Sequence, residues 1–290
     1  MCLSLAPTIL PAHATDPQSL GLKVSPGALL IQNVFLGKLY DVYKESGIRL
    51  TIHNQSDTAR TYVLSAHLPS DIGAQRWLEG YSEIPDLSWF WFDQQEITIK
   101  ADGVGYVKMY FEIPKEERYY NQNWVLALGI KGKPEAGPTI LLAAYPKIQI
   151  ETESKEAVRA RPDGPIGLEP SVIVIKNLPL GTKGQATLRL YNNDVDTRRY
   201  RLASKTFPLQ TGELSPIPLS PGYEWIPEPK WIAPNSGRVR VGPKERAAVS
   251  LSIKIPKDQD HRGRKWESIV FVESEDGRTR FARVQIETEQ

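Results

Sequence analysis

One set of landmarks occurs twice along the chain at nearly constant spacing, and this repeat constrains the fold more than any other feature. The pattern Gly-Tyr-x-x-Ile-Pro-(Asp/Glu)-x-x-Trp starts at Gly80 and again at Gly222. An Ile-Pro-Lys triplet follows each copy at the same distance, at Ile113 and at Ile255, and both copies close with Gln-Ile-Glu-Thr-Glu. Such self-similarity predicts two copies of one structural unit.

The earlier parts of the two copies also match, but the spacing between them changes. Leu50–Asn54 matches Leu188–Asn192, and Ile31–Val34 matches Ile175–Leu178. A change of spacing between matched segments marks a loop of different length. We therefore expect an insertion in the first copy near residues 40–46.

The segments between the landmarks have the pattern of strands rather than helices. Apolar residues alternate with polar ones over 249–255, as in a half-buried strand. Asp276-Gly277 predicts a hairpin turn, and the 23 Pro and 21 Gly residues favour many short elements. About seven strands per copy are typical of an immunoglobulin-like sandwich. The sequence predicts an all-β protein of two tandem immunoglobulin-like β-sandwich domains related by internal duplication, with domains at 22–153 and 168–290 joined by a linker at 154–167.

The later part of each copy resembles a family of bacterial immunoglobulin-like modules. The resemblance rests on Trp231-Ile232-x-Pro234, the alternating Val239 and Val241, the Ile255-Pro256 strand end and the final hairpin. These features are similar to hydin-type and NPCBM-associated repeats of the cell envelope. The resemblance implies the sandwich fold and a role in binding other molecules at a cell surface. It implies no catalytic residue.

The first residues predict export. Residues 3–10 are mostly apolar, and Ala12-His13-Ala14 has the small-x-small form of a cleavage site. We interpret residues 1–14 as the remnant of a signal peptide, which places the protein in the periplasm or at the cell surface. No apolar run approaches the ~18 residues that cross a membrane, so no transmembrane segment is expected.

Metal and catalytic chemistry lack a signature in the sequence. Cys2 is the only cysteine and the four histidines are scattered. Asn192, Asp194 and Asp196 have the spacing of calcium ligands, but the glycine and the final glutamate of such a loop are missing, so a turn is the preferred interpretation. The motifs of serine hydrolases, zinc proteases and P-loop enzymes are absent. We therefore expect neither an enzyme nor a cofactor or metal ion.

Charge divides unevenly between the two copies. The net charge is +2, but residues 1–153 carry 13 Lys and Arg against 17 Asp and Glu, while residues 154–290 carry 23 against 17. Basic residues on alternating strand positions form a solvated face, protect an edge from aggregation, or bind an acidic partner. Nucleic acid is not expected, because aromatic residues do not alternate with the basic ones. The candidate basic surface comprises Arg198, Arg199, Arg201, Arg238, Arg240, Arg262 and Arg264.

The run Trp89-Phe90-Trp91-Phe92 would be aromatic on both faces of a strand, because neighbouring side chains point to opposite faces. Trp89 and Trp124 recur at Trp231 and Trp266, which favours a pair of core tryptophans in each sandwich. The second aromatic face is covered by the protein's own loops, or it contacts a partner or a glycan. The candidate contact residues are Phe90, Trp91, Phe92, Tyr119 and Tyr120.

The sequence therefore predicts a non-catalytic, exported protein-protein interaction or structural module of a bacterial envelope or extracellular assembly. Two alternatives remain open: a periplasmic pilus-type chaperone, whose family also has two immunoglobulin-like domains, and a carbohydrate-binding surface protein. A protein partner or self-assembly is expected in the first two cases.

Overall fold

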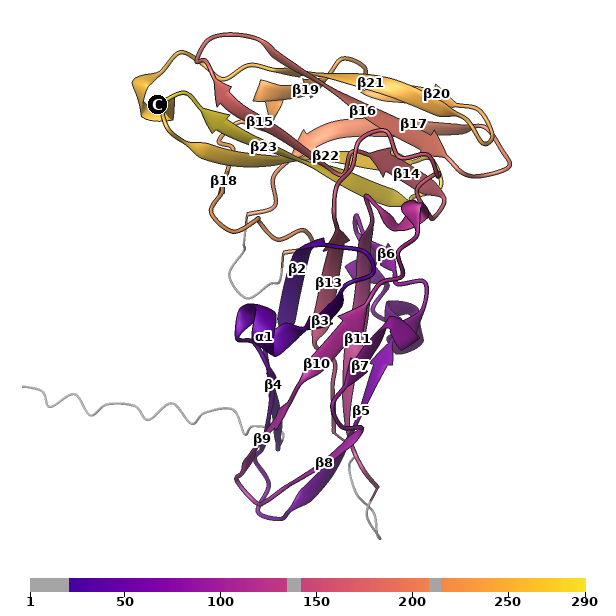
Figure 1. The fold of residues 1–290 in the computed structure, drawn as a ribbon, viewed down its shortest axis with the longest axis vertical. Helices are drawn as coiled ribbons and strands as arrows, with labels where there is room; N and C mark the ends of the chain where they lie inside the picture. Colours follow the sequence, from indigo (N-terminus) through magenta and orange to yellow (C-terminus); the bar gives the residue numbers. More distant parts are fainter. Residues whose placement is uncertain (1–20, 135–141, 209–214) are drawn as a thin grey trace, which may run out of the picture.

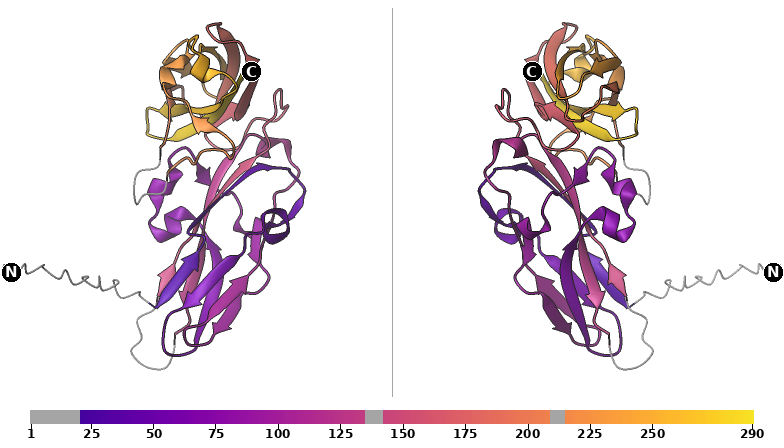
Figure 2. Two further views of the ribbon diagram at one scale, coloured as in Figure 1. Left: turned by 90° about the vertical axis from the view of Figure 1, so that its left-hand side faces the viewer. Right: turned by 90° about the vertical axis from the view of Figure 1, so that its right-hand side faces the viewer.

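The chain forms two β-sandwiches, and the second lies across one end of the first (Figure 1). The computed structural model describes residues 21–134, 142–208 and 215–290. The predicted signal-peptide remnant, residues 1–14, lies outside these described residues. Figure 2 shows the two layers of the first sandwich in profile and the second sandwich nearly end-on.

In the first sandwich, a sheet with five consecutive strands packs against two three-stranded sheets. Two further strands, β6 and β12, pair with β11 beside the five-stranded path. In sheet order, the strands of the first layer are β2 (Ala28–Val34), β13 (Lys147–Thr152), β11 (Asn123–Gly132), β5 (Arg60–His67) and β8 (Glu96–Ile99), with β6 (Ser82–Glu83) and β12 (Ala143–Ala144) beside them. The facing strands are β1 (Leu22–Ser25), β4 (Leu50–Asn54) and β9 (Val104–Val107), and β3 (Leu39–Asp41), β10 (Met109–Glu112) and β7 (Phe90–Phe92).

The second sandwich has the same layout, and the prediction of an all-β fold with two immunoglobulin-like sandwiches is confirmed. One layer is β14 (Ile166–Glu169), β16 (Gly184–Asn192), β21 (Arg246–Ile253) and β19 (Ile232–Pro234). The other is β15 (Val172–Leu178), β23 (Thr279–Thr288), β22 (Lys265–Ser274), β17 (Arg198–Lys205) and β20 (Arg238–Val241), with β18 (Glu224–Trp225) beside β22. Short 3-10 helices connect strands at Pro69–Ile72, Gln75–Leu78, Leu87–Trp89, Glu117–Tyr119, Pro229–Trp231 and Gln259–His261.

Each sandwich encloses its own tryptophan pair. Trp124 and Trp266 are buried, and Trp89 and Trp231 pack on them with ring centroids 5.7 Å and 5.8 Å apart. The interplanar angle is 57° in both pairs. The interpretation of these tryptophans as core residues is therefore correct, and the matched aromatics belong to the fold rather than to a ligand site.

The matched asparagines hold the same turn in both sandwiches. The Asn54 side-chain amide donates to the carbonyls of Thr58, Ile99 and Lys100. The Asn192 amide donates to the carbonyls of Asp196, Val241 and Gly242. These bonds satisfy backbone acceptors where two strands end, which explains why asparagine recurs at this place in the sequence.

A helix interrupts the first sandwich where the second has one continuous strand. Helix α1 (Val42–Ser46) separates β3 from β4, and the Asp41 side chain caps it by accepting from the Lys44 N–H. The register pairs Tyr40 with Phe111 and Gly184 with Ile253, so β16 spans the place of β3, α1 and β4. The insertion expected near residues 40–46 is this helix.

The connection between the sandwiches is bonded to both of them. The Asn121 side-chain oxygen accepts from Ser154 Oγ, the Lys155 N–H and the Ser171 N–H. Strand β14 begins at Ile166, two residues before the predicted start of the second domain. The connection is thereby held in place from both ends. No helix within the described residues is long and apolar enough to span a membrane.

Candidate functional site

A buried ion cluster joins the two sandwiches. Arg283 of β23 donates from Nε and Nη2 to the two carboxylate oxygens of Glu151 on β13, at 2.7 Å and 2.6 Å. Its Nη1 also donates to Glu267 Oε1 at 2.6 Å. The Arg283 side chain is 1% exposed. A bidentate pair with this geometry fixes both position and orientation across the junction.

Further donors complete the shell of Glu151. The Tyr81 hydroxyl donates to Oε1 at 2.6 Å, and Gln32 Nε2 donates to Oε2 at 2.9 Å. Burial alone would raise the pKa of Glu151, but the Arg283 charge and these hydrogen bonds outweigh burial and hold that pKa below its usual value. Burial, with Glu151 next to it, raises the pKa of Tyr81 well above its usual range. Glu151 therefore stays ionised and Tyr81 stays a hydrogen-bond donor.

Apolar side chains from both sandwiches pack beside the ion cluster. Gly80 lies against this packing, and a Cβ atom there would stand 2.6 Å from Phe281 Cδ1. The Gly80 N–H donates to Thr279 Oγ1 at 2.8 Å. The junction is therefore a closely packed interface and not a hinge. Its buried apolar members are Tyr81, Val125, Ile217, Ile269, Phe271 and Phe281.

Two more buried cations lie at the junction, and both are engaged within the chain. Arg280 Nη2 donates to Ser82 Oγ at 2.7 Å, and Lys147 Nζ lies 3.4 Å from the Ser215 carbonyl. Burial, and secondly the Arg76 charge, lowers the pKa of Lys147 to about 8. Both basic residues thus contact the protein's own oxygens at the junction between the sandwiches.

The five aromatic candidates do not form one exposed surface. Phe90, Tyr119 and Tyr120 are buried, and Phe92 packs against the core. Phe90 stacks parallel to Phe111 inside the sandwich at 6.3 Å. The prediction of Phe90, Tyr119 and Tyr120 as contact residues is corrected, because all three side chains are buried in the core of the first sandwich. Of the five, Trp91 alone is exposed, at 39%.

The residues around Trp91 were missed by sequence reasoning. Tyr110 of β10 stacks on Trp91 with centroids 6.1 Å apart. On the same outer face, the Arg49 guanidinium lies 3.6 Å from the Tyr106 ring centroid and 5.8 Å from that of Tyr43. The available signal was the sequence Met109-Tyr110-Phe111, because in a strand with Met109 and Phe111 facing the core, Tyr110 points to the opposite face.

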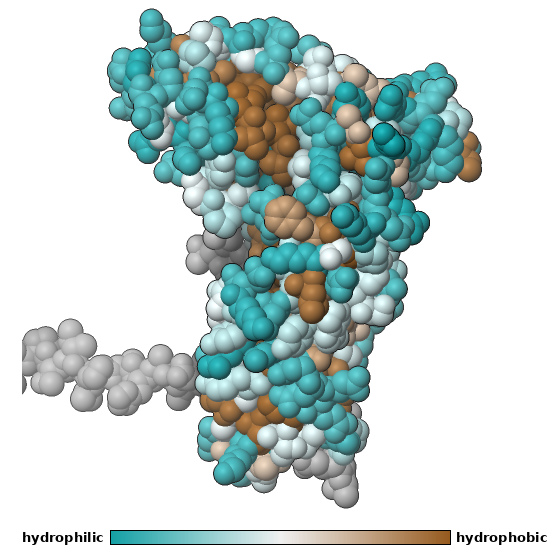
Figure 3. All heavy atoms as spheres, viewed as in Figure 1, coloured by the Kyte–Doolittle hydropathy of each residue, from teal (hydrophilic) through white to brown (hydrophobic). Residues whose placement is uncertain are grey.

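An apolar groove lies between edge strand β2 and helix α1. It has a volume of about 350 Å³ and is open along one edge of the first sandwich. Phe35 and Leu39 leave 54% and 55% of their surface exposed near it. Figure 3 shows apolar side chains reaching the surface on this side of the first sandwich and over β15 of the second. The apolar lining residues are Leu29, Leu30, Ile31, Phe35, Tyr40, Val42, Ile48 and Phe111.

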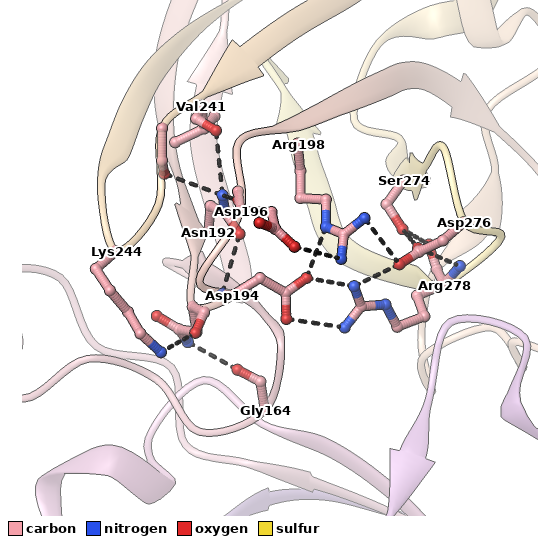
Figure 4. Close-up of polar contacts among 12 residues, drawn as sticks. Gly164, Asn192, Asp194, Asp196, Arg198, Val241, Lys244, Ser274, Asp276 and Arg278 are labelled. Atoms are coloured by element: carbon pink, nitrogen blue, oxygen red, sulfur yellow. Dashed lines mark hydrogen bonds and ion pairs between the residues drawn. The ribbon is translucent and has the colours of Figure 1, made fainter.

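The seven basic candidates fall into three places. Arg198 lies in an ion network with Asp194, Asp276 and Arg278 (Figure 4). Arg262 and Arg264 lie at the other end of β22, where they pair with Glu289 at 3.4 Å and Glu224 at 3.8 Å. The predicted basic surface is therefore not continuous. The remaining four, Arg199, Arg201, Arg238 and Arg240, share one exposed face of β17 and β20 and line a hollow of about 510 Å³.

The acidic residues of the calcium-like motif are used by the network of Figure 4. Arg278 and Arg198 donate to Asp194, and hydrogen bonds from Arg278 first, then from Arg198, hold the pKa of Asp194 below its usual value. Asn192 instead points inward to backbone carbonyls. The three oxygens do not converge on one point, and the turn interpretation accounts for their spacing.

Comparisons with known proteins give weak similarities of fold. No family model matches the sequence, and no curated protein matches it, so the resemblance to hydin-type and NPCBM-associated repeats stays a prediction. A Porphyromonas gingivalis protein of unknown function is similar over 92% of this chain and 99% of its own, at 13% identity and a TM-score of 0.33.

Two further solved structures have similar values. The Escherichia coli chaperone DraB is 12% identical over 93% of this chain and 98% of its own, at a TM-score of 0.30. A Salmonella enterica structure of the SafA pilin with the SafB chaperone gives 9% identity over 93% and 97%, at a TM-score of 0.31. Because these TM-scores lie below 0.5, the similarities assign no function to this chain.

Proposed function

We propose that this protein is a rigid two-domain protein-binding module of a bacterial envelope or extracellular assembly, which takes up an extended segment of a partner along strand β2. The observation that carries the proposal is a sheet edge that no described strand pairs with, beside an open apolar groove. Export rests on the sequence of residues 1–14, and the binding mode rests on the geometry of the first sandwich.

Among the described residues, strand β2 is the terminal strand of its sheet and pairs only with β13, in parallel. Its other edge therefore has no strand partner within that part of the chain. The Gly27 carbonyl accepts from the Lys147 N–H. Since alternate residues bond to the neighbouring strand in a parallel ladder, Leu29 and Ile31 face β13, and the backbone groups of Leu30 point away from the sheet.

The groove supplies the side-chain pockets that strand addition requires. Main-chain hydrogen bonds to an exposed edge give affinity, and pockets for every second side chain give specificity. Leu29 and Ile31 form one wall, and Val42 and Ile48 from the α1 segment belong to the other. The second sandwich has no counterpart of α1, because β16 is continuous there. An extended, apolar partner segment fits this site.

A proline in the edge strand tests the proposal. Leu30→Pro removes an outward N–H and leaves the ladder with β13 intact, and proline is tolerated at such edge positions. Val174→Pro is the matched control, since Val174 pairs with Gln285 as Leu30 pairs with Gln149. Full-length protein serves as bait for an envelope fraction, with mass spectrometry of what is retained. Leu30→Pro should lose proteins that wild type and Val174→Pro both retain. Equal retention by all three would overturn strand addition at β2.

A periplasmic pilus-type chaperone is the more specific form of the same function. The crossed arrangement of two immunoglobulin-like sandwiches beside an open edge favours it. In that case the retained proteins are incomplete fibre subunits, and co-expression should protect a candidate subunit from proteolysis. Degradation at the same rate with and without this protein would exclude that form.

Carbohydrate binding is the second candidate, favoured by the exposed Trp91–Tyr110 stack. Aromatic platforms of this kind bind sugar rings. Tryptophan fluorescence should then shift with a glycan and stay constant in Trp91→Ala. An unchanged signal across a broad glycan panel would rule this function out.

A further inference from the structure

We propose that the four exposed arginines of β17 and β20 bind an acidic, extended segment of a partner protein. This site lies on the second sandwich and is separate from the groove beside β2. Arg199, Arg201, Arg238 and Arg240 form it and are called the arginine face below.

The strand register brings these arginines together in two pairs. Arg199 is opposite Arg240, and Arg201 is opposite Arg238. The Leu202 N–H donates to the Gly237 carbonyl, so the arginine pairs occupy the alternate positions that lack mutual hydrogen bonds. At those positions the side chains of an antiparallel pair are closest, with Cα atoms about 4.5 Å apart.

Such an arrangement is unfavourable for the fold by itself. Like charges directly opposite each other destabilise a sheet. Among the residues that the structure describes, these four side chains form no ion pair within 4.0 Å. Glu273 of β22, which lies opposite Arg201, and Glu275, which directly follows that strand, line the same hollow. Four arginines against two glutamates leave an excess positive charge, which lies toward β20, the terminal strand of this sheet among the described residues.

The first sandwich shows that the scaffold does not need arginine there. The corresponding strands β5 and β8 pair in the same register, with Thr61 opposite Thr98 and Val63 opposite Glu96. Thr61 and Thr98 share a hydrogen bond of 2.9 Å, and Glu96 pairs with Lys133 at 2.9 Å. In the first sandwich, the polar side chains on this face of β5 and β8 have partners within the protein. In the second sandwich, the matching positions of β17 and β20 bring arginines opposite each other.

Protection of the sheet edge does not account for the whole set. Charges on an edge strand discourage edge-to-edge pairing, and Arg238 and Arg240 on β20 suffice for that purpose. Arg199 and Arg201 lie on the inner strand β17 and have no such role. Their position between β20 and β22 instead widens the charged area into a two-by-two array.

The geometry selects carboxylates on an extended backbone. Guanidinium groups bind carboxylates in a bidentate manner. Arg238 and Arg240 are two residues apart on one strand, which is the repeat of side chains on one face of any extended segment. The Ser236 hydroxyl already bonds the backbone N–H and carbonyl of Arg238, so recognition depends on side-chain charge more than on new ladder bonds. A segment with an acidic residue at every second position matches this spacing.

The test uses a fluorescently labelled peptide of alternating Glu and Thr and measures anisotropy with the full-length protein. Arg199→Thr/Arg240→Thr places the Thr pair of the first sandwich on the arginine face. This double variant should bind at least about tenfold more weakly than wild type, because two charged hydrogen-bond donors are lost. It should also unfold at a higher temperature, since the repulsion is removed, and this readout excludes misfolding as the cause of lost binding.

Two control variants separate the outcomes. Arg262→Thr/Arg264→Thr removes the same charge elsewhere on the second sandwich and should bind the peptide like wild type. Leu30→Pro should also bind it normally, so that this proposal and strand addition at β2 fail independently. Equal weakening in both arginine double variants would overturn the proposal by showing a non-specific charge effect. Tighter binding of heparin or single-stranded DNA than of the peptide would overturn it in favour of another polyanion.

Discussion

The Lys147 side chain is buried at the junction between the two sandwiches. Its ammonium group has one weak hydrogen bond, to the Ser215 carbonyl at 3.4 Å. Its pKa falls from the ordinary 10.5 to about 8, mainly through burial. The folded protein therefore binds fewer protons at this site than the unfolded chain between those two values, and stability rises with pH across that window. Below pH 8 the site carries a constant penalty.

Lys147→Met should therefore stabilise the protein near neutral pH by about 1–3 kcal/mol. The gain should shrink as the pH rises from about 8 to 10.5, where both proteins carry a neutral side chain. Urea unfolding of both proteins across this range measures the difference. A gain that does not change with pH would show that Lys147 is not desolvated in the folded state.

The closing pentapeptide shows at single residues what local sequence determines and what it does not. Thr152 and Thr288 have the same role. The Thr152 hydroxyl donates to the Tyr119 carbonyl, and the Thr288 hydroxyl donates to the His261 carbonyl. Each carbonyl belongs to the last residue of the preceding 3-10 helix. Glu151 is buried against Arg283, whereas Glu287 lies on the surface beside Lys265 at 3.6 Å. The difference arises because β13 faces the other domain and β23 presents Glu287 to solvent. No pattern within five residues contains that information.

At the scale of elements, period-two alternation and turn residues were sufficient to predict the strands and the sandwich class. They did not determine which strands pair. The aromatic run at Trp89–Phe92 was recognised as two-faced, yet only the facing sheet decides that Phe90 is the buried member. Likewise, Arg199 and Arg240 were both singled out, but their contact is a matter of register between strands 41 residues apart in sequence. Long-range pairing is what single-sequence reasoning lacks.

Helix α1 provides a prediction at this scale. Replacing residues 42–49 with the Ala-Thr of positions 186–187 should join β3 and β4 into one strand like β16. The variant should fold cooperatively and lose about 2 kcal/mol, because buried Val42 is removed. It should also lose the partner retained through the groove.

Urea unfolding followed by tryptophan fluorescence, together with the envelope pull-down, measures both effects. The first sandwich would depend on α1 for its fold if the cooperative transition disappeared. A folded variant that retains the partner would show that the α1 wall of the groove is not used.

At the scale of the whole molecule, the orientation of the two domains depends on Arg283. Arg283→Met leaves Glu151 and Glu267 buried without their cation, and removing one partner of a buried pair typically costs about 3–5 kcal/mol. We expect a lower unfolding free energy and a wider range of inter-domain orientations. Calorimetry and small-angle X-ray scattering measure the two effects.

Arg201→Met, on the exposed surface of the same domain, serves as the comparison. It should neither lower the unfolding free energy nor widen the range of inter-domain orientations. If Arg283→Met gave the scattering profile and stability of wild type, apolar packing around Phe281 would be sufficient to hold the junction. A double-mutant cycle with Glu151→Gln isolates the coupling between the two charged groups.

The connecting segment that Asn121 ties down has a consequence for avidity. In a flexible tandem protein, the second binding event depends on linker length, and effective concentrations reach only the millimolar range for short flexible linkers. Here the groove on one sandwich and the arginine face on the other keep a fixed separation. A partner carrying an apolar strand and an acidic strand at the matching distance gains nearly the full product of two weak affinities, and one with any other spacing gains almost nothing. The fixed distance between the groove and the arginine face therefore selects partners by the distance between their two binding segments.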